Sequence, residues 1–162
     1  MLLATHALAG AIIGNLVNNA FIAFLLGLIS HFLIDAIPHL DFPKYKKGND
    51  MKKLKYNGKP LSKFQFNLIL LNIILSVLAL IYLFLRGENT APYVMGILGA
   101  VIIDIPDDFP FLNEKYKNTA PFKYIYNFHM KIQTIQPPKS IGIFTQYITG
   151  LILLIILLKI NV

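Results

Sequence analysis

Residues 64–85 read FQFNLILLNIILSVLALIYLFL and contain no charged side chain. A helix needs about 20 residues to cross a bilayer core of about 30 Å. This stretch of 22 residues is therefore long enough to span a membrane. Residues 141–160 form a second stretch of that kind, interrupted by uncharged polar residues and by Lys159 near its end. The two stretches predict an integral membrane protein with helical spans.

Three shorter apolar stretches lie around these two and carry ionisable side chains. The first stops at Asn18-Asn19, a turn signal, and the others stop at Pro38 and Pro106, because proline disfavours helix in the residue before it. We therefore predict an all-α fold, a single polytopic membrane helix bundle over residues 1–162. Its five expected helices cover residues 2–17, 20–37, 64–85, 91–105 and 141–160.

The composition agrees with a membrane protein. Of the 162 residues, 56% are hydrophobic and only 14% are charged, whereas a soluble domain has about 25% charged residues. Such a balance excludes a disordered chain, which combines low hydrophobicity with high charge. The chain has no cysteine, so disulfides and thiolate metal sites are excluded.

The positive charges predict the orientation of the bundle. Thirteen of the 15 Lys and Arg residues fall in the connecting segments 38–63 and 106–140. Positively charged loops are retained on the cytoplasmic side, so we expect both segments to be cytoplasmic loops of an inner-membrane protein. Their lysines would then meet anionic lipid head groups, and we expect the same of the basic aromatic segment around His129. No Arg-rich or aromatic-interleaved motif indicates nucleic-acid binding.

An internal similarity relates two of the expected helices. An offset of 69 aligns residues 27–35, GLISHFLID, with residues 96–104, GILGAVIID. Both segments run towards the same side of the membrane and continue into a proline and further carboxylates. This similarity predicts two parallel helical hairpins followed by a C-terminal helix. Repeats of this kind place binding sites at the junction of the two halves.

Three expected helices share one spacing of small and ionisable residues. Residues at i, i+4 and i+8 lie on one helix face, and small residues there allow close helix contact. An ionisable group inside a membrane faces a partner or a water-filled cavity. We therefore expect three faces to turn towards one another: His6, Gly10 and Gly14; Gly27, His31 and Asp35; Gly96, Ala100 and Asp104.

The predicted topology brings histidines and aspartates from three segments to the same cytoplasmic depth. Such nitrogen and oxygen donors suit a divalent zinc, manganese or iron ion, of which we expect zinc. Asp35 and Asp104 are also candidate catalytic groups, because a carboxylate can act as a general base on water. The candidate metal ligands are His6, His31, Asp35, His39, Asp41, Asp104 and Asp107.

Structural roles stay open for the same residues. A buried His–Asp pair or an aspartate can hold two helices together by hydrogen bonds. The Pro-His and Pro-Asp segments at 38–41 and 106–108 can be interfacial turns, in which proline and aspartate are common.

The segments Thr5-His6-Ala-Leu-Ala-Gly10 and Ser30-His31-Phe-Leu-Ile-Asp35-Ala-Ile-Pro38-His39-Leu-Asp41 resemble a known signature. It belongs to small inner-membrane metal-dependent hydrolases, a group with a LexA-regulated branch and a distant similarity to zinc-dependent phospholipase C-type sequences. The resemblance covers roughly residues 1–42 and, more weakly, residues 104–108. It implies a metal site and hydrolysis of a phosphoester or lipid-like substrate. The implied ligands are His6, His31, Asp35, His39 and Asp41, with Asp107 matching a Pro-Asp element.

The chain departs from that family at two places. Relatives carry a His-Arg-Gly-x-Thr-His-Ser segment between the halves, which this chain lacks. They also have a second histidine four residues after His129, where this chain has Gln133. Two other functions therefore remain open. One is a carboxylate-based transporter using Asp35 and Asp104, and the other is a non-catalytic scaffold or anchor using the lysines of residues 44–63.

Overall fold

The protein is described by a computed structural model that covers residues 1–39, 55–56, 59–60, 63–86, 90–105, 119–132 and 137–160. Within these residues the chain forms six helices and one antiparallel pair of two-residue strands. The prediction of an all-α fold is therefore confirmed at the level of fold class. The elements are α1 (Leu3–Val17), α2 (Ala20–Asp35), β1 (Lys55–Tyr56), β2 (Lys59–Pro60), α3 (Lys63–Arg86), α4 (Thr90–Val101), α7 (Phe122–Ile132) and α8 (Lys139–Ile160).

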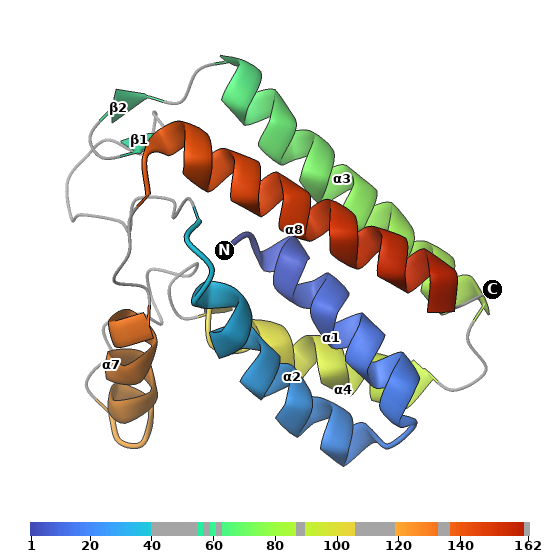
Figure 1. The fold of residues 1–162 in the computed structure, drawn as a ribbon. Coiled ribbons are helices and arrows are strands. Elements are labelled where there is room, and N and C mark those ends of the chain that lie inside the picture. Colours follow the sequence, from blue (N-terminus) through green and yellow to red (C-terminus); the bar gives the residue numbers. More distant parts are fainter. Residues whose placement is uncertain are drawn as a thin grey trace.

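Helix α1 is the central element of the bundle. It packs on α2, α4, α8 and α3. Helices α3 and α8 lie side by side above it, while α2 and α4 lie on its other side (Figure 1). Helices α1, α3 and α8 run in one direction and α2 and α4 in the opposite one (Figure 1). The start of α1 therefore meets the ends of α2 and α4 at one end of the bundle, where α7 packs on α2.

Glycines bring α1, α2 and α4 into backbone contact. A Cβ added at Gly10 or at Gly27 would overlap the carbonyl group of Gly96. A Cβ at Gly14 would overlap the backbone of Pro92 in the same way. Only a residue without a side chain allows helix axes to approach so closely. The three glycine-bearing faces predicted from the sequence do turn towards one another.

Large apolar side chains cover much of the outer surface. Buried apolar residues gather around Leu8, Ile12 and Leu157, but Phe21 and Leu33 on α2 are 68% and 67% exposed. Among the described residues, one helical segment is long and apolar enough to cross a membrane, namely Ser140–Ile160 of α8. The apolar segments of the other helices are shorter: α1, α2, α4 and, within the predicted span 64–85, Ile73–Tyr82 of α3. The bundle of five membrane-spanning helices therefore stays a prediction.

Two helices end earlier than predicted. Helix α2 ends at Asp35 instead of residue 37, because the chain tightens into a turn before Pro38, with Ile37 N 3.1 Å from Ile34 O. Helix α4 ends at Val101 instead of residue 105. Residue 104 lies in a turn, in which Asp104 N donates to Val101 O at 3.1 Å.

Segments predicted as loops contain regular structure. Helix α7 lies within residues 106–140, and the short strands β1 and β2 lie within residues 38–63. The 11 residues of α7 are far too few to cross a bilayer. Long apolar stretches in the sequence therefore do not predict this helix.

The internal repeat is visible in α2 and α4, which run parallel (Figure 1). Positions aligned by the offset of 69 face each other, because Gly27 contacts Gly96 and His31 contacts the Ala100 carbonyl. The helices that precede them are not equivalent. Helix α1 packs on both α2 and α4, whereas α3 packs on α8 and α1.

Candidate metal centre

Histidines and aspartates from four parts of the chain meet at the end of the bundle where α1 begins. His6 is in the first turns of α1, and the last turns of α2 carry His31 and Asp35. Asp104 follows α4, and His129 comes from α7. His39 follows α2, and Thr145 of α8 anchors this segment by donating from Oγ1 to Pro38 O at 2.5 Å.

Asp35 is the centre of the cluster. Its residue is 2% exposed, and the Nε2 atoms of all four histidines of the chain approach its carboxylate. The distances from Nε2 to the nearest carboxylate oxygen are 2.6 Å for His129, 3.1 Å for His6, 3.3 Å for His31 and 3.6 Å for His39. A buried carboxylate needs compensating positive charge or hydrogen-bond donors. The four histidines and the Met1 ammonium, whose nitrogen is 2.8 Å from Asp35 Oδ1, are placed to supply this compensation.

Asp104 closes the cluster on the side of α4. Its Oδ1 lies 3.7 Å from His31 Nε2 and 3.9 Å from His129 Nε2, and its Oδ2 lies 3.7 Å from His6 Nε2. Its side chain is 14% exposed, while that of Asp35 is fully buried. Asp104 is therefore the less buried carboxylate of this pair.

Four of these residues could hold a metal ion. His31, Asp35, Asp104 and His129 each offer one ligand atom, and these atoms lie within 4.8 Å of one another. Zn–N and Zn–O bonds of about 2.0–2.1 Å give a tetrahedron with ligand atoms about 3.3 Å apart. His31 Nε2 lies 3.3 Å from both His129 Nε2 and Asp35 Oδ2, which fits that spacing, whereas His129 Nε2 and Asp35 Oδ2 are at a hydrogen-bonding distance of 2.6 Å.

Two histidines have tautomers fixed by backbone carbonyls. His31 Nδ1–H donates to Ala100 O at 2.8 Å, and His39 Nδ1–H donates to Ile37 O at 2.7 Å. In the neutral ring, Nε2 then carries a lone pair that points towards the Asp35 carboxylate. Two lone pairs repel unless a cation lies between them or the ring takes up a second proton. A carbonyl on the far nitrogen is also the usual support of a metal-binding histidine.

Other ring nitrogens in the cluster lack a hydrogen bond. Among the described residues, neither ring nitrogen of His6 has a hydrogen-bond partner, although Nε2 is close to Asp35, and His129 Nδ1 has none either. His6 is fully buried and stacks on His31, with ring centroids 4.2 Å apart. Buried polar atoms in proteins normally have partners, so these point to a missing ligand. A bound cation would satisfy His6 Nε2.

The structure brings together most of the residues predicted from the sequence. His6, His31, Asp35 and Asp104 form one cluster, and His39 reaches it from the segment after α2. Asp41 and Asp107 lie outside the described residues.

The placement of His129 differs from the sequence prediction. We expected its segment to lie on anionic lipid, but the ring is 1% exposed and Nε2 lies 2.6 Å from Asp35 Oδ2. Its inner position follows from helix periodicity, because Ile125, His129 and Ile132 recur at i, i+4 and i+7 and are the less exposed residues. A polar ring on the apolar stripe of a short helix was the signal that could have identified this ligand.

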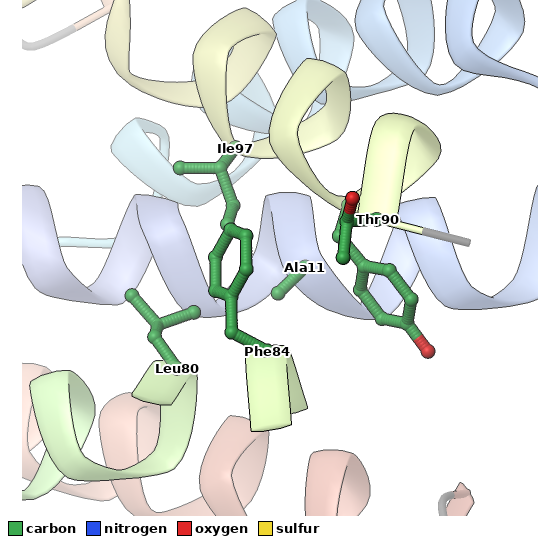
Figure 2. A pocket seen from close by; sticks show the side chains of 6 residues that line it. Ala11, Leu80, Phe84, Thr90 and Ile97 are labelled. Atoms are coloured by element: carbon green, nitrogen blue, oxygen red, sulfur yellow. The ribbon is translucent and has the colours of Figure 1, made fainter. Parts of the chain in front are cut away.

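A small cavity elsewhere in the bundle is apolar. It has no room for a water molecule, and it lies between α1, α3 and α4. Figure 2 shows Phe84, Leu80 and Ile97 beside Ala11, and Thr90 at the first turn of α4. Since α4 ends at the histidine cluster, this cavity lies towards the opposite end and contains none of the predicted site residues.

No family model, curated protein or solved structure matches this chain. The functional conclusion therefore depends on the geometry of the cluster and on the sequence patterns.

Proposed function

We propose that the chain is a multi-pass inner-membrane hydrolase that uses a divalent metal, zinc first among the candidates. The observation that carries the proposal is the convergence of all four histidines on buried Asp35, with Asp104 opposite them and partly open. A structural His–Asp pair needs one histidine for one carboxylate. Four imidazoles around one carboxylate are instead typical of a cation site.

The proposed membrane location is supported by the surface and by the charges. Exposed Phe21, Leu33 and Phe144 belong to apolar faces that a soluble monomer seldom presents to water. The cluster lies at the end of the bundle from which the two Lys-rich segments, 38–63 and 106–140, leave the helices. By the positive-inside rule this end is cytoplasmic, which puts the proposed site at the inner membrane surface.

The chemistry supplied by a divalent ion in such a site is polarisation of a phosphoryl or carbonyl oxygen and activation of water at neutral pH. The carbonyl of Ala100 holds the His31 ring in its orientation, and burial shields Asp35 from solvent. Asp104 is the candidate general base, because it is the partly exposed carboxylate and can pass a proton on to solvent.

A phosphoester or lipid-like substrate suits this location. A site at the membrane surface can be reached by a head group while the acyl chains stay in the bilayer. The surrounding lysines, eight of them in residues 44–63, attract anionic groups such as phosphate. The family resemblance of residues 1–42 points to the same class of reaction.

The test compares the wild type with His31→Ala and Asp35→Ala after purification in detergent. We expect bound metal near one ion or more per chain in the wild type and loss of both metal and hydrolysis in each variant. Metal is measured by inductively coupled plasma mass spectrometry. Hydrolysis is followed with a bis-aryl phosphate and with phospholipid vesicles, before and after removal of metal with a chelator.

Leu33→Ala is the matched control. This residue lies between the two ligands on α2, and its side chain is 67% exposed. It should keep both metal and activity. Unchanged metal content in His31→Ala and Asp35→Ala would contradict the proposal.

A further inference from the structure

We infer that the cluster holds two metal ions side by side, with Asp35 bridging them. The inference rests on the proposed metal site and extends it. The first position is the group of His31, His129, Asp35 and Asp104 described above. The second position is formed by His6 and His39 with Oδ1 of Asp35.

The contacts of the two carboxylates divide into two sets. Oδ2 of Asp35 faces His31 and His129, and Oδ1 of Asp104 faces the same two rings. Oδ1 of Asp35 instead faces His6 and His39, at 3.1 and 3.6 Å, and Oδ2 of Asp104 faces His6 at 3.7 Å. The pair His31 and His129 therefore faces one oxygen of Asp35, and the pair His6 and His39 faces the other.

The histidines of the second position have the features expected of ligands. His39 is 5% exposed, and its Nδ1–H is held by the Ile37 carbonyl, so Nε2 presents a lone pair, as it does in His31. His6 is fully buried, and among the described residues its Nε2 has no hydrogen-bond partner. In the first position, the Ala100 carbonyl orients His31, and His129 Nε2 faces both aspartates. In the second position, the Ile37 carbonyl orients His39, and His6 Nε2 faces both aspartates.

A positive group already lies at the second position in this structure. The Met1 ammonium nitrogen is 2.8 Å from Asp35 Oδ1 and 2.6 Å from His39 Nε2. These are the atoms that the second ion would bind. The ammonium therefore marks the place as one that attracts a cation.

Two ions would also explain the number of donors. One zinc ion takes four protein ligands or fewer, whereas four imidazoles and two carboxylates are present. Two ions that share carboxylates lie about 3.5–4 Å apart and clamp the attacking and leaving oxygens of an in-line displacement. This arrangement suits hydrolysis of a phosphoester, the substrate class proposed above.

The test measures metal stoichiometry in the detergent-purified full chain after loading with Mn²⁺ alone. The wild type should bind about two ions per chain, with the electron paramagnetic resonance spectrum of an exchange-coupled pair. His6→Gln/His39→Gln should bind about one ion and show an isolated-ion spectrum. His31→Gln/His129→Gln is the matched variant, which removes the first position and should also lower the stoichiometry by about one ion.

Each other outcome has a definite meaning. A single ion in the wild type that survives His6→Gln/His39→Gln would overturn the second position and leave the proposed function standing. No bound ion in the wild type would overturn both. If the double variant unfolds, as judged by circular dichroism, His39→Gln alone decides the question, because His39 follows α2 and lies outside the helices. An unchanged stoichiometry and an unchanged coupled spectrum in that variant would contradict the inference.

Discussion

Asp35 and Asp104 come from aligned positions of the internal repeat, yet their surroundings differ. Asp35 ends α2 and is enclosed by the four histidines, whereas Asp104 stands in the turn after α4 and keeps a side chain that is 14% exposed. A carboxylate that is buried among ligands suits binding, and one that reaches solvent suits proton transfer. The two aligned residues are therefore expected to have different roles.

Asp104→Asn tests this division. The amide keeps the shape of the side chain but cannot accept a proton, so we expect kcat to fall by about 10²–10⁴. Metal content should fall less than in Asp35→Asn, because Asp35 approaches all four histidines. Both quantities are measured in the same preparation. Leu98→Ala, at a 38% exposed position of α4, is the control. Equal loss of metal in Asp104→Asn and Asp35→Asn would contradict the assignment.

Sequence patterns identified some residues of the cluster and missed another. His6, His31, Asp35 and Asp104 were identifiable because the i, i+4 spacing places each on a face with small residues. His129 was not identified, because its role depends on how α7 packs against α2. That packing leaves no trace in the local spacing around His129 other than its place on an apolar stripe.

At the scale of elements, the backbone contact of α1, α2 and α4 positions the site. Gly96 is the residue at which the other two helices meet α4, through Gly10 and Gly27. This contact fixes the relative height of the three helices. It therefore also fixes the distances between His6, His31 and the aspartates one to two turns away.

Gly96→Ala should disturb both stability and the site. The new Cβ would overlap backbone atoms of α1, which cannot give way as a flexible side chain can. We expect a loss of about 1–3 kcal/mol in the free energy of unfolding and weaker metal binding. Thermal unfolding in detergent can be followed by far-ultraviolet circular dichroism, since the chain has no tryptophan. Leu33→Ala, on a 67% exposed side chain, should change stability much less. A fully stable Gly96→Ala would show that the helices do not approach so closely.

On the scale of the whole molecule, the direction of the helices agrees with the charge pattern. The site, the end of α2 and the start of α8 share one end of the bundle, which is also the end of the Lys-rich segments. The connection at residues 86–90 contains a single cation, Arg86. This distribution predicts that the site faces the cytoplasm and that residues 87–89 face outward.

Single cysteines can test this orientation, because the chain has none of its own. In intact cells, a membrane-impermeant maleimide should label Asn89→Cys but not Lys52→Cys. Lys52→Cys should react only after the membrane is permeabilised. Labelling of Lys52→Cys from outside intact cells would invert the proposed topology and move the site away from the cytoplasm.

The sequence by itself determined the helical class of the fold, the approximate limits of the long helices and the identity of five of the clustered histidines and aspartates. These features depend on local properties, namely the length of apolar runs, the proline and asparagine residues at their ends, and the spacing of residues along one helix face. Such properties are set by neighbours within one or two turns of the chain.

The tertiary structure alone decided the rest. It brought His129 into the cluster, placed Asp35 inside and Asp104 at the edge, and divided the two oxygens of Asp35 between two pairs of histidines. These features depend on how closely and at what height separate helices pack, which is set by contacts between residues about 70 to 100 positions apart in the chain. Spacing along one helix contains no information on those contacts, and the glycines that permit them act only when the partner helix is present.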